Sequence, residues 1–139
     1  MDEQKNVDLV RQAYDAFKRG DIPNLLGRLS QDVDWEAMVG VGNKVPTGGR
    51  RKGLEQVARF FGTLDTNMAF QQFEPREFIA ERDRVVVLGY YKGTVKPTGR
   101  PFSSEWAMVF TVENGKITKF QEFTDSSAIL SAFGVPVHA

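Results

Sequence analysis

Hydrophobic residues recur every three or four positions over most of the first half of the chain, and every second position in the second half. This change predicts helices followed by strands, because a helix repeats every ~3.6 residues and a strand every ~2. We expect a first helix over residues 4–19 that ends at Gly20, a short second helix capped by Asp21, and a third helix over residues 54–64. Their buried sides are expected to be formed by Val7, Val10, Tyr14, Phe17, Leu25, Leu26, Leu29, Leu54, Val57, Ala58, Phe60, Phe61 and Leu64.

Strand periodicity is found over residues 33–39, 70–81, 84–95, 102–112 and 117–123. Turn sequences separate the last four stretches, and Asn114-Gly115 is typical of a tight hairpin. A last short helix is expected after the strands, capped by Ser126-Ser127 and ending at Gly134. Three N-terminal helices packed on a curved antiparallel or mixed sheet of about four to six strands make one α+β domain over residues 1–139. A helix laid across the concave face of such a sheet leaves a pocket.

The segment 40–53 resists regular assignment. It carries five glycines, one proline and four cations, a composition that disfavours a helix or a central strand. We therefore expect a loop over a cavity mouth or edge. Phosphate binding by Thr47–Lys52 is the weaker interpretation, because the strand–GxxxxGK(S/T)–helix arrangement is missing.

Charge and composition exclude several classes of binding partner and of chemical site. Eighteen basic residues balance eighteen acidic ones, which gives no reason to expect nucleic acid or an anionic membrane as partner. Cysteine is absent, so disulfides, thiolate nucleophiles and thiolate metal sites are excluded. The single histidine, His138, lies next to the C-terminal residue, where we expect a frayed side chain and no metal ligand. Without a signal-peptide core or a membrane-length apolar stretch, the default expectation is a soluble cytoplasmic protein.

Asp125 is the first candidate for chemistry, because an ionisable group here follows directly on the apolar strand 117–123. In a buried position its carboxylate would have a raised pKa and serve as a general base. The same carboxylate precedes Ser126-Ser127 and a short apolar helix, so it is equally suited to capping that helix. Both roles stay open.

Several short segments carry a family resemblance through their order and spacing. They are Tyr14-Asp15-Ala16-Phe17 with Gly20-Asp21, Trp35, Arg51-Lys52-Gly53, Phe60-Phe61, Trp106, Asn114-Gly115-Lys116-Ile117 and Phe123-Thr124-Asp125. Together they resemble the nuclear transport factor 2-like superfamily and, within it, the SnoaL-like and ketosteroid-isomerase-related proteins. The resemblance covers nearly the whole chain. It implies a cone-shaped domain with a cystatin-like roll, usually dimeric, whose apolar pocket serves different members for isomerisation, cyclisation, epoxide hydrolysis or binding.

The ketosteroid isomerase mechanism uses an aspartate base beside a tyrosine and a protonated aspartic acid. By the resemblance, the tyrosine position falls on Ala13, next to Tyr14, the base on Ala37 and the acid on Met108. Glu36 adjoins Ala37, but adjacent strand residues face opposite ways. A functional ketosteroid isomerase is therefore not expected.

This chain retains one member of the catalytic pair that the resemblance to SnoaL-like polyketide cyclases implies. Their last-strand aspartate base matches Asp125, whereas Met108 stands where they have a histidine. Limonene-type epoxide hydrolases need an Asp-Arg-Asp arrangement that we do not find. The groups available to stabilise an enolate beside Asp125 are Tyr90, Lys92, Arg51 and the Trp106 indole N–H.

The resulting expectation is a homodimer that binds a small apolar molecule without cofactor or metal. Asp125 is the expected catalytic residue, and the expected pocket lining consists of Tyr14, Trp35, Phe60, Tyr90, Trp106, Met108, Phe123 and Arg51. Two function classes remain. The first is an isomerase, cyclase or lyase acting on a carbonyl substrate, and the second is a non-catalytic ligand carrier or dimeric interaction module.

Overall fold

The computed structural model describes residues 2–136 and has the α+β architecture that the periodicity predicts. Its helices are α1 (Glu3–Lys18), α2 (Ile22–Leu26), α3 (Gly53–Asn67) and α4 (Ser126–Ala132), with a single 3-10 turn η1 (Gly42–Lys44). Its strands are β1 (Leu29–Ala37), β2 (Gly49–Lys52), β3 (Met68–Glu81), β4 (Arg84–Val95), β5 (Arg100–Glu113) and β6 (Lys116–Thr124). His138 lies outside the described residues.

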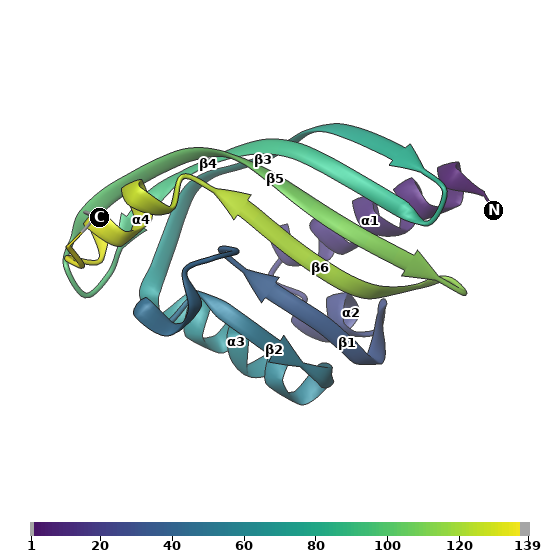
Figure 1. Ribbon diagram of the computed structural model, residues 1–139, viewed down its shortest axis with the longest axis horizontal. Helices are drawn as coiled ribbons and strands as arrows, with labels where there is room; N and C mark the ends of the chain where they lie inside the picture. The colour runs from purple at the N-terminus through teal and green to yellow at the C-terminus, as the bar shows by residue number, and fades with distance from the viewer. Residues whose placement is uncertain (1, 137–139) are drawn as a thin grey trace.

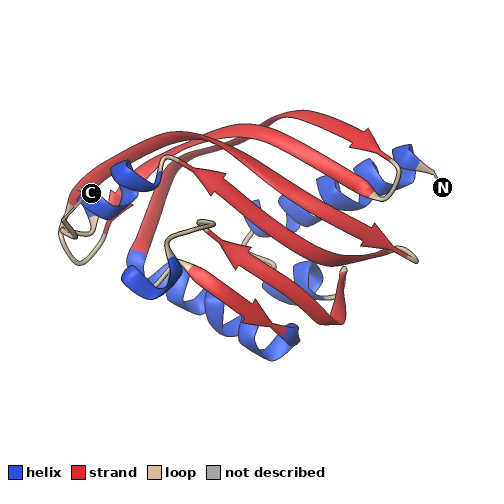
Figure 2. Cartoon of the chain, in the orientation of Figure 1, coloured by secondary structure: helices blue, strands red, loops and turns tan. Residues whose placement is uncertain are grey.

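The strands form one mixed sheet in the order β2-β1-β6-β5-β4-β3. Neighbours from β3 to β6 are antiparallel, as expected of a meander, whereas β1 pairs parallel with β6. Figure 1 shows the long strands β3, β4 and β5 arching over the N-terminal helices. Figure 2 shows α4 as a separate short helix beyond the end of β6.

Local sequence explains where the elements begin and turn. The Asp21 side chain accepts a hydrogen bond from the Asn24 N–H at the start of α2, as predicted. Asn114 and Gly115 both have positive φ, which matches the right-handed twist of the β5–β6 hairpin. Of the residues considered as the cap of α4, Asp125 and not Ser126 accepts the Ala128 N–H.

The segment 40–53 is not entirely a loop. Residues 49–52 form β2, which pairs antiparallel with β1 from Ala37↔Gly49 to Asp34↔Lys52. A glycine-rich sequence is tolerated here because β2 is an edge strand and needs hydrogen bonds on one side only. Residues 40–48 remain irregular apart from η1.

One extra residue in β6 decides which side chains face inward. Val112 is paired with Ile117 and Thr111 with Lys119, so Thr118 has no partner opposite it on β5 and forms a β-bulge. Ile117 is buried before the bulge, and Phe120 is buried after it. The inward face therefore changes from odd-numbered to even-numbered residues within the strand.

The core lies between the concave side of the sheet and α1 and α3, with α4 packed on β5 at the end of the sheet. Its largest fully buried side chains are Val10, Val33, Val45, Val57, Val85, Val87, Val95, Ile117 and Ile129. Between residues 2 and 136, no helix combines the length and apolar character needed to cross a bilayer.

Candidate functional site

The concave side of the sheet encloses an apolar cavity. The space open to the centre of a water molecule is about 80 Å³, whereas one water needs about 10–15 Å³ by this measure. The cavity therefore has room for a small organic molecule. Its lining is formed by Ala13, Tyr14, Phe17, Leu25, Leu29, Trp35, Met38, Thr47, Phe60, Phe61, Leu64, Met68, Phe70, Phe73, Tyr91, Met108, Phe110, Ile117, Phe120, Glu122 and Ile129.

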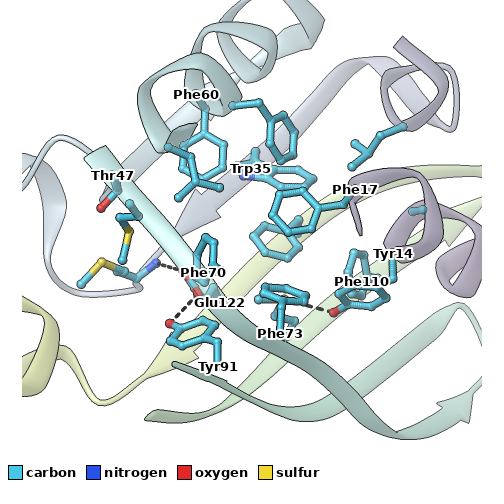
Figure 3. A pocket seen from close by; sticks show the side chains of 18 of the residues that line it. Tyr14, Phe17, Trp35, Thr47, Phe60, Phe70, Phe73, Tyr91, Phe110 and Glu122 are labelled. Carbon is cyan, nitrogen blue, oxygen red and sulfur yellow. Dashed lines mark hydrogen bonds between the residues drawn. The ribbon is translucent and has the colours of Figure 1, made fainter. Parts of the chain in front are cut away.

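Glu122 provides the one carboxyl group among these lining residues. It follows Phe120 on the inward face of β6, after the bulge at Thr118. The Met38 backbone N–H donates to its Oε1 at 3.1 Å, and the Tyr91 hydroxyl donates to its Oε2 at 2.9 Å (Figure 3). Both carboxyl oxygens are thus held while the group faces the cavity.

The surroundings of Glu122 favour its protonated form. Burial raises the pKa of this carboxyl above its ordinary value, and the hydrogen bonds from Tyr91 and the Met38 N–H offset the rise only in part. The described lining residues include no lysine or arginine that would stabilise the carboxylate. A carboxyl with a raised pKa is suited to both accepting and returning a proton.

Two tyrosines share the cavity with Glu122. Burial raises the pKa of Tyr14 well above 10.0, and the nearby Glu122 charge raises it further. The same two causes raise the pKa of Tyr91. Both hydroxyls are therefore neutral donors. The Tyr14 hydroxyl donates to Met108 Sδ at 3.0 Å, and because a thioether is a weak acceptor, this donor is available to a better one.

Four of the predicted pocket residues line the cavity, namely Tyr14, Trp35, Phe60 and Met108. Trp106 is buried and stacks on Tyr14 with ring centroids 6.0 Å apart, so it supports the cavity wall from behind. The cavity walls are consequently rich in aromatic faces.

Arg51 does not contact the cavity as a ligand-binding cation. Its guanidinium donates to the carbonyl oxygens of Pro46 and Gly48, at 2.9 and 2.7 Å, and lies over the Phe60 ring. Arg51 therefore fastens the segment that carries Thr47, a lining residue, against α3.

Asp125 lies outside the cavity. It is exposed, and its carboxylate accepts the Ala128 N–H at 3.2 Å as the N-cap of α4. Of the two roles that the sequence left open, this geometry matches the cap. The inward carboxylate near the end of β6 is Glu122.

Tyr90 and Phe123 face away from the cavity. Tyr90 is on the outer side of β4, where Arg76 lies over its ring, and Tyr91 takes the inward position. Phe123 is 44% exposed on β6. Their placement corrects the prediction, and the cause is strand alternation, which turns neighbouring residues to opposite faces. Glu36 also faces outward, as expected, and pairs with Arg50 at 3.4 Å.

Sequence reasoning missed Tyr91 and Glu122. A signal for Tyr91 was present, because Val85 and Val87 are apolar at the same alternate positions of β4. For Glu122 the corresponding signal was hidden by the bulge at Thr118. Among residues 2–136, no group of three or more His, Asp or Glu side chains is arranged to hold a metal ion.

The family model of the SnoaL-like domain matches residues 10–120. The chain belongs to the SnoaL-like domain family. An NTF2-like protein of Burkholderia xenovorans is similar in structure, with a TM-score of 0.85, 31% identity, and coverage of 95% of this chain and 98% of that one. TerC, co-crystallised with polyporic acid, has a TM-score of 0.81 and 26% identity over 94% of this chain and 98% of its own.

A curated relative of this SnoaL-like chain is the uncharacterised protein Rv0034 of Mycobacterium tuberculosis, 25% identical over 96% of this chain and 98% of that protein. These SnoaL-like and NTF2-like relatives support the α+β fold with a curved sheet.

Proposed function

We propose that this protein binds a small, apolar, carbonyl-containing molecule in the cavity and that Glu122 transfers a proton next to the carbonyl, without a cofactor. The observation that carries the proposal is a single carboxyl group, held by two hydrogen bonds, in an otherwise uncharged aromatic cavity. Such a group is costly to bury, and titratable groups with shifted pKa values concentrate at functional sites.

The cavity walls suit a flat, apolar ligand. Trp35 stacks on Phe120 with ring centroids 3.9 Å apart, and Phe60 and Phe61 flank the indole. Aromatic faces of this kind hold apolar rings through area burial and offset stacking. The co-crystal of the similar TerC protein with polyporic acid supports a small organic molecule as the ligand class.

Two side chains, Glu122 and Tyr14, carry out the proposed proton transfer. Glu122 in its ionised form takes a proton from the carbon beside the carbonyl. The electron pair of that C–H bond forms a carbon–carbon double bond, and the π electrons of the carbonyl move to its oxygen. Tyr14 donates its hydroxyl hydrogen to the developing enolate in place of Met108 Sδ. Glu122 then returns the proton to another carbon, which gives an isomerase, or to a leaving group as its bond to carbon breaks, which gives a lyase. In a cyclase, the enolate carbon bonds to a second carbonyl carbon of the same molecule, and Glu122 returns the proton to the alkoxide that forms.

The alternative is a ligand carrier without turnover. It is favoured by Ala37 and Met108, two apolar residues at positions where the resemblance places catalytic polar groups. The Tyr14 hydroxyl is consequently hydrogen-bonded to the Met108 sulfur. A carrier needs the same aromatic walls and would use Glu122 only to accept a ligand hydroxyl. Binding alone therefore does not distinguish the two functions, whereas turnover does.

A thermal-shift screen tests ligand binding. We expect flat apolar carbonyl compounds to raise the melting temperature, because a ligand that binds only the native state at 100-fold its Kd adds about 2.7 kcal/mol. Ala13→Leu, which fills the cavity from α1, should abolish the rise. Ala58→Leu on α3, whose side chain is not among the lining residues, should keep it. A rise that survives Ala13→Leu would contradict binding in this cavity.

We also propose a homodimer formed by the outer face of the sheet. Leu88, Ala107 and Phe123 lie in register across β4, β5 and β6, and Leu88 and Phe123 are 37% and 44% exposed. Arg76 and Glu105 border the hollow beside this row, so two copies related by a two-fold axis bring opposite charges together. An apolar row with charges of both signs around it therefore suits a second copy of this chain.

Sedimentation velocity measures this assembly. The wild type is expected to sediment as a dimer and Leu88→Lys/Phe123→Lys as a monomer with unchanged circular dichroism, because four buried charges per dimer would lack partners. Lys92→Glu, another outward change on β4, serves as the control for altered charge. A double variant that stays dimeric would place the interface elsewhere.

A further inference from the structure

A row of hydroxyl groups leads from Glu122 along the inner face of the sheet to Thr124, the last residue of β6. The Tyr91 hydroxyl lies 2.9 Å from Glu122 Oε2 and 2.7 Å from Thr124 Oγ1. Thr124 Oγ1 in turn lies 3.0 Å from Ser104 Oγ. Each separation is within hydrogen-bond range, so the carboxyl group is the first member of a continuous network.

The inner end of this network has few other polar neighbours. Tyr91 is 3% exposed, and apart from Glu122 the titratable groups among the described lining residues are the two tyrosines. Tyr14 donates to Met108 and is not hydrogen-bonded to Glu122. Tyr91 is thus the only side chain, among the described residues, that is hydrogen-bonded to the carboxyl group.

The other end of the network is at Thr124. This residue is half-buried and is followed directly by the exposed Asp125, so the network ends where the chain meets solvent. Ser104 fixes its position, since Ser104 accepts the Asp125 N–H at 2.9 Å and donates to the Glu105 carbonyl oxygen. Thr124 therefore has an anchored hydroxyl between Tyr91 and Ser104.

A single hydroxyl hydrogen on Tyr91 has two acceptors, Glu122 and Thr124. When Glu122 is ionised, that hydrogen points to the carboxylate. When Glu122 is protonated, the carboxyl hydrogen points to the Tyr91 oxygen and the Tyr91 hydrogen is free to point to Thr124. The network is satisfied in both protonation states, which is the requirement for passing a proton along it.

We propose that Tyr91 and Thr124 form a proton relay that exchanges the Glu122 proton with water at the end of β6. Tyr91 receives the carboxyl proton as it passes its own hydrogen to Thr124, and Thr124 passes its hydrogen to water. No hydroxyl changes its charge, and the net products are a Glu122 carboxylate inside and a hydronium ion outside. The reverse sequence reprotonates Glu122.

The relay has a consequence for turnover that rests on the proposed function. A ligand filling the apolar cavity blocks access of water to Glu122 from the cavity itself. Through the relay, the carboxyl group is returned to its starting state while the ligand is still bound. Tyr91 and Thr124 are positioning residues in this scheme, because neither needs to touch the substrate.

The experiment uses the unliganded full chain, so it does not depend on the substrate. Stopped-flow infrared spectroscopy follows the carboxyl band of protonated Glu122 after mixing with D2O, and the band is assigned by its loss in Glu122→Gln. We expect Thr124→Val to slow hydrogen–deuterium exchange by about tenfold or more, on the scale of positioned proton transfer. Thr124→Ser, which restores a hydroxyl, should recover the wild-type rate.

Two further variants separate the relay from general effects on the strand. Thr118→Val removes a hydroxyl of β6 that donates to Glu113 and lies outside the network, and it should exchange as fast as wild type. Tyr91→Phe should slow exchange as Thr124→Val does. Wild-type exchange in Thr124→Val, or equal slowing in Thr124→Val and Thr124→Ser, would overturn the relay. Neither result bears on the proposed function, which fails on a different observation, namely full turnover in Glu122→Gln.

Discussion

Replacing Glu122 with glutamine is expected to lower turnover by about 10²–10⁴-fold while leaving ligand binding nearly unchanged. The amide keeps the size of the side chain, and its oxygen still accepts the Met38 N–H. It does not accept a proton from carbon at neutral pH. The measurement compares kcat/KM with ligand affinity for the wild type and the variant, using a compound found in the thermal-shift screen.

Two matched carboxylates make this prediction specific. Glu36→Gln changes an outward side chain on β1 that pairs with Arg50, and it should keep full turnover. Asp125→Asn affects the cap of α4, so a small stability change with unaltered turnover is expected. Loss of turnover in Asp125→Asn with retained folding would return the role of base to Asp125. Turnover preserved in Glu122→Gln would exclude the proposed mechanism.

The raised pKa of Glu122 is expected to appear in the pH dependence of stability, with Glu122→Gln as the reference. Because the folded protein holds the Glu122 proton more tightly than the unfolded chain, this group's contribution is complete below the ordinary carboxyl pKa. It is lost as the pH rises through the higher pKa of the folded state. The unfolding free energy of the wild type should therefore fall relative to that of Glu122→Gln over this pH interval, as measured by urea unfolding.

Gly89→Ala is expected to destabilise the protein by about 1–3 kcal/mol, the range for overpacked cores. A β-carbon at this position of β4 would clash with the Trp106 ring and would lie 2.5 Å from the Glu74 carbonyl oxygen on β3. The indole would have to shift away from Tyr14, and the backbone of β3 would have to yield as well. Urea unfolding measures the loss, and it should be accompanied by weaker ligand binding.

Gly62→Ala is the control, because the same substitution is expected to stabilise the protein at this position. A β-carbon at residue 62 of α3 meets no atom within 4 Å, so the change should stabilise the helix by roughly 0.5–1 kcal/mol. A neutral result for Gly89→Ala would mean that Trp106 and β3 adapt without cost. The interpretation of Trp106 as a rigid support behind Tyr14 would then be wrong.

Much of the fold was predictable because its local signals agree with its packing. The spacing of Val7, Val10 and Tyr14 identifies the buried side of α1, and Asn114-Gly115 fixes the β5–β6 hairpin. The edge strand β2 was missed for the opposite reason. Its four residues, Gly-Arg-Arg-Lys, have low strand propensity and are held in place by pairing with β1.

The site was less predictable because strand alternation is sensitive to a single residue. Counted from buried Ile117, an uninterrupted strand would turn Phe123 inward and Glu122 outward. The bulge at Thr118 reverses this, and no turn residue or proline announces it. On β4 the pattern is regular, so the choice of Tyr90 over Tyr91 was an error of inference that counting from Val85 and Val87 would have corrected.

The parallel pairing of β1 with β6 also constrains how the molecule folds. Trp35 and Phe120 lie far apart in the sequence, yet they stack on each other in the cavity wall. Contacts of such large sequence separation are formed late, because they require closure of a long chain loop. During synthesis, Glu122 therefore remains exposed to solvent until almost the entire chain has emerged. The unfavourable burial of its carboxyl group and the formation of the surrounding wall then occur in the same step.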